Sequence, residues 1–320
     1  QADFRITDPL RALRRQNKVA TCVWEQHVFT APRFHTASEL YRLNPDVHIV
    51  QHYIQDDALA AMNTWRGLSH RPFTVYALDD AVTDIDTKSP FFKNFAANTR
   101  TRLKYALARA DRMVVSTDFL AELYKNLISD IQVVPNRLEM EKWLSLRTAK
   151  RTSSKPRIGW AGGTTHQRDL SLLKEVIEQT REEADWIFFG MCPDEILPLV
   201  KETYPFMSFD EYPTFLASLN FDIAVAPLAE TVFNRGKSNL RLLEYGILGL
   251  PVVCTDIEPY RNSPACRVRN NADHWVSALR ERIHDADARE AEGRAMRRWV
   301  QEKFLLENHL DEWLLAHTPN

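Results

Sequence analysis

The sequence lacks three features that would each assign it to a particular class of proteins. Its cysteines, Cys22, Cys192, Cys254 and Cys266, form no Cys-x-x-Cys pair and have no histidines at zinc-site spacing. No apolar run approaches the roughly 18 residues that span a bilayer, and the first residues do not resemble a signal peptide. The net charge of −2 shows no basic excess. These absences predict a cytoplasmic protein that does not bind nucleic acid.

The cysteines are therefore expected to be free thiols. Cys22 and Cys254 lie inside apolar, strand-like runs, which predicts that both are buried. Free thiols are typical of a reducing compartment.

Short β-branched runs alternate with helical patterns along almost the whole chain. In the first half, strands are expected over 18–24, 47–53, 72–78, 111–116 and 131–135. In the second half they are expected over 157–162, 185–190, 221–228, 250–255 and 266–269. Helices are expected over 1–16, 55–67, 91–109, 117–127, 167–183, 193–203, 237–248 and 272–284. This alternation predicts α/β domains with parallel sheets.

The chain is long enough for two domains, at about 100–200 residues each. The basic, serine-containing stretch 146–157 has no apolar periodicity and is interpreted as a linker. The expected domains are therefore residues 1–148 and 155–320. The chain opens on a helical pattern where an α/β domain normally opens on a strand, so a first strand or a larger preceding region is expected, as in a piece of a longer protein.

The tail over 285–317 has a helical pattern with a stripe of large apolar side chains, including Trp299, Phe304 and Trp313. Such a stripe needs a surface to cover. The first domain is one candidate, and the sheet of the second domain is the alternative.

A glycine pair follows the first strand of the second domain, in IGWAGGTTHQRDL at residues 158–170. Gly162 and Gly163 would allow the backbone to approach a bulky anion, and the helix that follows Thr164 would offer free N–H groups to phosphate oxygens. The alternative is an ordinary tight turn.

The stretch FNRGKSNLRLLEYGILGLPVV, residues 233–253, combines a buried helix face with a charged stripe. Leu240, Leu243 and Ile247 share one helical face. A separate stripe at i, i+4 and i+7 is formed by Lys237, Arg241 and Glu244. Ser238 is a candidate N-cap, and Gly246 indicates close packing. The stripe is either a solvated surface with an Arg–Glu pair or part of a ligand site.

This stretch resembles the nucleotide-sugar motif of family 4 glycosyltransferases, which have the GT-B fold. The fuller pattern resembles a subgroup of bacterial polysaccharide and O-antigen assembly, and it is carried by Pro227, Leu228, Phe233, Asn234, Lys237, Ser238, Arg241, Leu243, Glu244, Tyr245, Gly249, Pro251, Val252, Val253, Pro259 and Tyr260. Residues 158–170, 114–124, 133–143, 4–13 and 75–84 are similar to further parts of these enzymes. The resemblance implies two Rossmann-like domains facing a cleft, with C-terminal helices packing back toward the first domain.

The resemblance also implies roles for individual residues. Glu244 would accept hydrogen bonds from the ribose hydroxyls, and Lys237 would neutralise the departing diphosphate, with Arg168 as a lesser candidate. The remaining donor-binding candidates are Gly162, Gly163, Thr164, Asn234 and Ser238. Many relatives carry a second glutamate where this chain has Gly236, which leaves the donor sugar undetermined.

The first domain is expected to bind the acceptor. Asp79 and Asp80 follow a strand directly, where adjacent carboxylates could orient or deprotonate an acceptor hydroxyl. The alternative is that one of them caps a loop. His52 is either a residue of this site or a hydrogen-bonded core histidine. The basic and aromatic segment 91–112 is either a solvated amphipathic helix or a contact with an anionic, lipid-linked acceptor or a membrane surface.

The resemblance thus predicts a glycosyltransferase, retaining and independent of metal and cofactor, that moves a sugar from a nucleotide-diphosphate donor to a saccharide or glycolipid. Its expected place is the cytoplasm, including the inner face of the membrane. The alternatives are a nucleotide-sugar epimerase and a non-catalytic sugar- or nucleotide-binding domain of a larger assembly protein.

Overall fold

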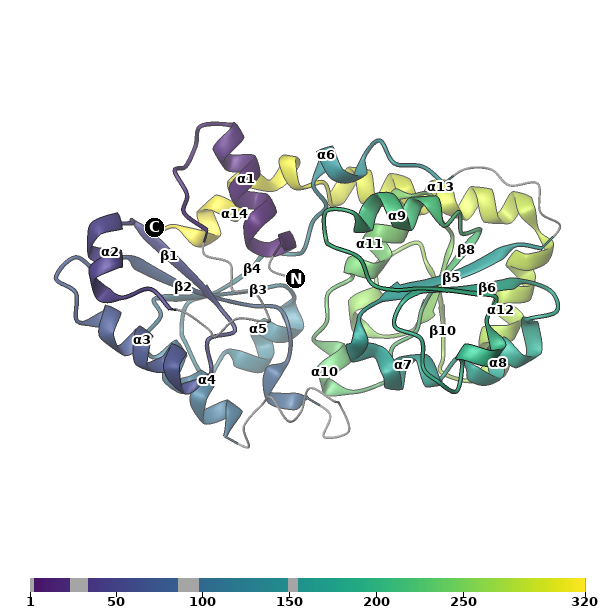
Figure 1. Cartoon of the computed structure of the whole chain (residues 1–320), viewed down its shortest axis with the longest axis horizontal. Coiled ribbons are helices and arrows are strands. Elements are labelled where there is room, and N and C mark those ends of the chain that lie inside the picture. The colour runs from purple at the N-terminus through teal and green to yellow at the C-terminus, as the bar shows by residue number, and fades with distance from the viewer. Residues whose placement is uncertain (1–2, 24–33, 86–97, 149–154, 320) are drawn as a thin grey trace. The chain divides into compact units, whose positions relative to one another are not determined.

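A computed structural model of the chain describes residues 3–23, 34–85, 98–148 and 155–319 (Figure 1). These residues form two compact units. The first unit contains the described chain up to Pro135 and the last residues from His309 onward, whereas the second contains Asn136–Asn308.

The first unit is built on a parallel sheet with the strand order β1-β2-β3-β4. Its strands are β1 (Val47–Gln51), β2 (Phe73–Leu78), β3 (Arg112–Val115) and β4 (Ile131–Val133). Every residue of β3 and all but the first of β2 are buried, as expected for strands covered on both faces. Because all four strands run in the same direction, their carboxyl ends lie at one edge of the sheet.

Helices flank this sheet, and the helices from the two ends of the chain pack together. The helices are α1 (Asp8–Arg15), α2 (Ala37–Leu43), α3 (Asp56–Arg66), α4 (Thr99–Leu107), α5 (Asp118–Tyr124) and α14 (Leu310–His317). Helix α14, yellow in Figure 1, packs beside α1, which is purple. The indole Nε1 of Trp313 donates a hydrogen bond of 2.9 Å to the carbonyl of Arg5. The expected return of the C-terminal tail to the first unit is confirmed for α14.

The strand expected over 18–24 is wrong for its described residues. Residues 18–23 have no regular secondary structure and are partly or fully exposed, and Cys22 is exposed rather than buried. An apolar run forms a strand only where a neighbouring strand accepts its backbone hydrogen bonds, and none of the strands β1 to β4 pairs with these residues. The alternating pattern alone could not reveal this.

The second unit contains a parallel sheet with the strand order β10-β9-β8-β5-β6-β7. Its strands are β5 (Arg157–Gly162), β6 (Asp185–Gly190), β7 (Glu202–Tyr204), β8 (Ile223–Ala226), β9 (Val252–Thr255) and β10 (Cys266–Val268). Cys254 is buried in β9, as predicted, and all four cysteines are free thiols. The alternating side chains of β5, β6 and β8 divide the core between the two faces of the sheet.

Two groups of helices cover these faces. The unit contains α6 (Met140–Trp143), α7 (Gln167–Ser171), α8 (Lys174–Thr180), α9 (Tyr212–Ser218), α10 (Val232–Arg235), α11 (Leu240–Ile247), α12 (Ala272–His284) and α13 (Ala286–Lys303). One face packs on α7, α8 and α12, with Trp160, Trp186 and Trp275 in a single apolar cluster. Helices α9, α11 and α13 lie on the opposite side of the sheet (Figure 1).

Helices α11 and α13 approach each other unusually closely. A Cβ on Gly246 would lie 2.8 Å from Cγ2 of Val300, which confirms the predicted close packing. A Cβ on Gly293 would lie only 2.0 Å from the carbonyl oxygen of Gly249. The absence of side chains at these positions lets the two helices approach, and this contact fixes α11 against the sheet.

Two further expectations differ from the structure. The helix expected over 193–203 is wrong: a short 3₁₀ turn over Leu197–Leu199 leads into the edge strand β7, since Pro198 cannot continue a regular helix. Residues 136–148 belong to the second unit, although we expected them in the first. Leu138 pairs with Leu305, and the backbone N–H of Met140 donates to the Glu307 carboxylate, which ties this segment to the second unit.

The described part of the chain is thus a mixed α/β protein with two parallel sheets, which confirms the predicted fold class. Among the described helices, none is both long enough and apolar enough to cross a membrane.

Candidate functional site

In the second unit, the candidate residues gather at the carboxyl end of β5. A Cβ on Gly162 would lie 2.6 Å from Cζ2 of Trp160 and 2.8 Å from Nη2 of Arg241, so only glycine fits there. A Cβ on Gly163 would meet open space. The two glycines therefore differ: Gly162 lets Arg241 approach the strand, and Gly163 leaves its backbone accessible.

Glu244 forms a buried charged cluster with two partners. Its Oε2 accepts hydrogen bonds from Nη1 of Arg241 at 2.9 Å and from the Tyr212 hydroxyl at 3.0 Å. Arg241 also donates to the Tyr212 oxygen at 2.9 Å, which closes a triangle. Only 5% of the Glu244 side chain is exposed, so the stripe predicted from the sequence is not a solvated surface. No hydrogen bond among the described residues engages the other oxygen, Oε1.

Burial and the neighbouring side chains have opposite effects on the pKa of Glu244. Burial raises the pKa of Glu244 above its ordinary value, while the charge of Arg241 and the hydrogen bond from Tyr212 act in the opposite direction. Burial beside Glu244 raises the pKa of Tyr212 well above its usual range, so this phenol remains a hydrogen-bond donor.

Helix α11 is held at β5 by Tyr245, whose hydroxyl accepts a backbone hydrogen bond that no neighbouring strand accepts. Strands β5 and β8 pair only at Ile158 and Gly159, which frees the backbone of Ala161. The Tyr245 hydroxyl accepts a hydrogen bond of 2.8 Å from this N–H. Because β5 needs this bond, the register of α11 is fixed, and with it the position of Glu244.

The turn before α11 contains Lys237 and Ser238. The ammonium of Lys237 lies 4.9 Å from the centre of the Phe233 ring. Ser238 was expected to cap the helix. The N-cap position is Asn239, but the Ser238 hydroxyl accepts from the backbone N–H of Leu240, the first helical residue, at 3.4 Å and from Nδ2 of Asn136 at 2.8 Å. Lys237 therefore lies in a loop that is fastened on its carboxyl side.

Asp169, in α7, is buried and is the centre of a hydrogen-bond network. Its Oδ1 accepts from the backbone of Ala229 at 2.8 Å and from Nδ2 of Asn234 at 2.7 Å. Its Oδ2 lies 2.8 Å from Nδ1 of His166. The Asn234 amide also donates to the carbonyl of Ala229, so the structure places it in the bracing of the loop.

His166 lies close to the basic residues of this edge. Burial, followed by the positive charge of Lys237, lowers the pKa of His166 to about 4, despite its bond to Asp169. The imidazole is therefore neutral at pH 7. Thr164, in the 3₁₀ turn that contains His166, and Arg168, in α7, flank it at exposed positions.

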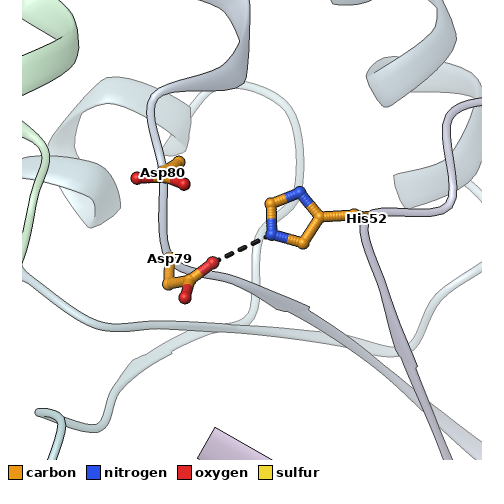
Figure 2. Close-up of side chains that lie close together, drawn as sticks. All are labelled: His52, Asp79 and Asp80. Atoms are coloured by element: carbon orange, nitrogen blue, oxygen red, sulfur yellow. Dashed lines mark hydrogen bonds and ion pairs between the residues drawn. The ribbon is translucent and has the colours of Figure 1, made fainter. Parts of the chain in front are cut away.

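In the first unit, the ends of β1 and β2 bring together His52, Asp79 and Asp80 (Figure 2). Nε2 of His52 lies 2.9 Å from Oδ1 of Asp79. Asp79 is only 2% exposed, whereas 31% of the His52 side chain is exposed. His52 has a positive φ of 57°, which is uncommon for a residue with a side chain and occurs often at functional sites.

The buried surroundings of Asp79 favour its ionised form. Burial opposes the charge, but the hydrogen bond from His52 and the charges of His52 and Arg5 prevail and lower the pKa of Asp79 to about 2. Burial likewise opposes the charged imidazole, but Asp79 and Asp80 raise the pKa of His52 above its ordinary value. Arg5 is fixed by donating to the carbonyls of Val134 and Val114.

One of these relationships has no signal in the sequence, and two have a signal that sequence reasoning missed. Tyr212 lies 32 residues before Glu244, in a helix with no motif of its own. The pairing of Asp169 with His166 could have been suggested from their i, i+3 spacing on a helix start. The pairing of His52 with Asp79 could have been inferred from strand ends that lie at one edge of a parallel sheet.

The fold was compared with known proteins. No protein-family model matches the sequence, and no curated protein matches it. Solved structures do match. A Staphylococcus aureus TarM variant, in complex with fondaparinux, α-GlcNAc-glycerol and UDP, has a TM-score of 0.63 over 88% of this chain and 58% of its own, at 14% identity.

Two further structures cover more of their own length. Anabaena HepE, in complex with UDP and glucose, has a TM-score of 0.65 over 96% of this chain and 88% of its own, at 12% identity. A glycosyltransferase from Rickettsia africae has a TM-score of 0.62 over 88% and 78%, at 14% identity. The chain spans little more than half the length of TarM. At these identities the likeness shows a shared fold, that of GT-B glycosyltransferases.

Proposed function

We propose that this protein is a glycosyltransferase that uses a nucleotide-diphosphate sugar as donor and a saccharide or glycolipid as acceptor. The second unit would bind the donor and the first unit the acceptor. This proposal follows from the resemblance to the family 4 subgroup that acts in polysaccharide and O-antigen assembly. Retention of configuration is taken from the same resemblance.

The observation that carries the proposal is the state of Glu244. A carboxylate that is almost fully buried and fixed through one oxygen by Arg241 and Tyr212 presents its other oxygen in a defined direction. Such an acceptor suits the hydroxyls of a ribose. The fold likeness to HepE and TarM, whose structures contain UDP, supports this assignment.

The diphosphate would lie beside the carboxyl end of β5. Gly163 leaves space for the anion, and Lys237 and Arg168 supply positive charge without needing a metal ion. His166 would border the anion as a neutral imidazole, because burial, followed by the charge of Lys237, lowers its pKa to about 4. Asn234 and Ser238 would act indirectly by holding the two loops in place.

In the acceptor unit, the hydrogen bond between Asp79 and His52 supports different roles for these residues. Oδ1 of Asp79 lies 2.9 Å from Nε2 of His52, so Asp79 would position His52, and the more exposed His52, together with Asp80, would contact the acceptor. A lipid-linked acceptor would bring the protein to the cytoplasmic face of a membrane.

Nucleotide binding tests the donor site directly. Calorimetric titration with UDP, GDP and dTDP should find at least one that binds, and Glu244→Gln should weaken that nucleotide about tenfold or more, since a hydrogen bond to a charged group contributes roughly 1.5–3 kcal/mol. Glu290→Gln, on the exposed surface of α13, is the matched control and should bind normally. Unchanged affinity in Glu244→Gln would reject the site.

Turnover then distinguishes the three functions. Incubation with a panel of UDP-, GDP- and dTDP-sugars should release nucleotide only when an acceptor is present. Conversion of one nucleotide sugar into another without acceptor would identify an epimerase, and binding without any turnover would identify a non-catalytic domain. Anomeric analysis of the product tests retention, and activity in EDTA tests independence from metal.

A further inference from the structure

Three potential metal ligands converge at one edge of the first unit's sheet. His52 follows β1 directly, and Asp79 and Asp80 follow β2, which pairs with β1 in parallel. One ligand atom from each side chain lies within 4.8 Å of the other two. In Figure 2 the two carboxylates lie on the same side of the imidazole ring. The strand pairing itself therefore creates a mixed set of one nitrogen and two carboxylate ligands.

One carboxylate oxygen of Asp79 has no hydrogen-bond partner among the described residues. Oδ1 of Asp79 is bonded to His52, but its Oδ2 is buried and has no hydrogen-bond partner among the described residues. A buried carboxylate oxygen without a partner loses its hydration without compensation, at a cost of roughly 1–3 kcal/mol. Only 2% of Asp79 is exposed, so bulk water does not replace the missing hydrogen bond.

The distance between His52 and Asp79 matches that between neighbouring ligands of a metal ion. In octahedral coordination with bonds of about 2.1 Å, neighbouring ligand atoms are separated by roughly 3 Å. Nε2 of His52 and Oδ1 of Asp79 are already 2.9 Å apart. A cation that bridges them would take the place of the proton in this hydrogen bond, so that the imidazole would bind through its Nε2 lone pair.

We propose that His52, Asp79 and Asp80 form a binding site for a divalent cation. The mixed nitrogen and oxygen ligands favour Mn²⁺ or Zn²⁺ over Ca²⁺, which prefers six to eight oxygen ligands. The cation would bind to the acceptor unit and would leave the remaining coordination positions to water or to hydroxyl groups. It does not replace Lys237 at the diphosphate, and its binding requires neither donor nor acceptor.

Mn²⁺ titration of the whole chain without nucleotide, followed by the EPR signal of free Mn²⁺, tests the site. One saturable site is expected, and Asp80→Asn should weaken it at least about tenfold, since even residues that only support ligands contribute that much. Asp84→Asn changes a carboxylate in the same loop outside the cluster and should keep the affinity of the native chain. Equal affinity in both variants would overturn the proposal.

Zn²⁺ provides an independent readout that requires no change at the buried Asp79. Nitrogen NMR of the native chain should show the Nε2 resonance of His52 shift on addition of Zn²⁺, and not on addition of Ca²⁺. The absence of saturable binding of both Mn²⁺ and Zn²⁺ would reject the site. Because these measurements use no sugar, a failed metal site would leave the proposed transferase intact, and a failed transferase would leave the metal site intact.

Discussion

Tyr212 and Glu244 are joined by a hydrogen bond of 3.0 Å between the phenol and Oε2 of the carboxylate. The same phenol oxygen accepts from Arg241 at 2.9 Å. Tyr212 also stacks on Phe189, at the end of β6, with the ring centres 5.3 Å apart. Tyr212 therefore links the charged cluster on α11 to the core of the second unit.

Removal of this phenol should destabilise the protein. Tyr212→Phe leaves Glu244 and Arg241 each without one buried partner, and we expect the free energy of unfolding to fall by about 1–3 kcal/mol. Tyr204→Phe removes a comparable bond to Glu202 at the partly exposed edge strand β7, and it should cost about 1 kcal/mol or less. Urea denaturation of both variants compares them, and equal losses would contradict the structural role of Tyr212.

The close contact between α11 and α13 should not tolerate a methyl group. Gly293→Ala improves helix propensity by about 1 kcal/mol, but its Cβ would overlap the carbonyl oxygen of Gly249, and backbone shifts of this kind cost about 1–3 kcal/mol or more. We expect a lower melting temperature. Gly163→Ala, where a Cβ meets open space, should melt like the native protein. A Gly293→Ala variant that melts normally would show that the helices do not approach so closely.

Mild acid should destabilise the first unit through two buried histidines. Burial lowers the pKa of His48 to about 4 and that of His317 to about 3, whereas both return to about 6.5 on unfolding. The unfolded chain therefore binds more protons below pH 6.5, and stability is lost as the pH falls from there. Each histidine should contribute a slope of about 1.4 kcal/mol per pH unit between pH 6 and 5.

The pKa of His52 is shifted in the opposite direction. A raised pKa stabilises the fold below pH 6.5, so the contribution of His52 to stability is constant between pH 6 and 5. His317→Asn retains a donor for the carbonyl of Trp313 and should reduce the slope by about one histidine's share. Denaturation midpoints measured from pH 7 to 5 test this. An unchanged slope in His317→Asn would mean that His317 titrates normally.

The C-terminal helix should stabilise the first unit specifically. Arg112, at the start of β3, donates to the carbonyls of Leu315, Ala316 and Thr318. A chain ending at Asn308 loses these acceptors and the packing of Trp313. We expect amide hydrogens of β1 to β4 to exchange faster, while those of β5 to β10 retain their protection. Uniform acceleration in both units would contradict this assignment.

The sequence by itself determined the parallel α/β architecture, because apolar strands that alternate with amphipathic helices leave few other ways to bury their surfaces. It also indicated two candidate stretches, with Gly162 and Gly163 after one strand and Lys237 and Glu244 at the helix that follows another, since each pair lies within a single short motif. Where the pattern failed, the reasons differ. Over 18–23 no strand of the sheet pairs with the run, which local periodicity cannot report, whereas over 193–203 Pro198 interrupts the helix.

Only the tertiary structure decided which side chains meet. The partnership of Glu244 with Tyr212 depends on the packing of α9 against α11. Asp79 and Asp80 are adjacent in the sequence, but Asp79 is bonded to His52 and is only 2% exposed. Burial and strand register are long-range properties of the folded chain, and they bring His52 next to an Asp-Asp pair that follows a different strand.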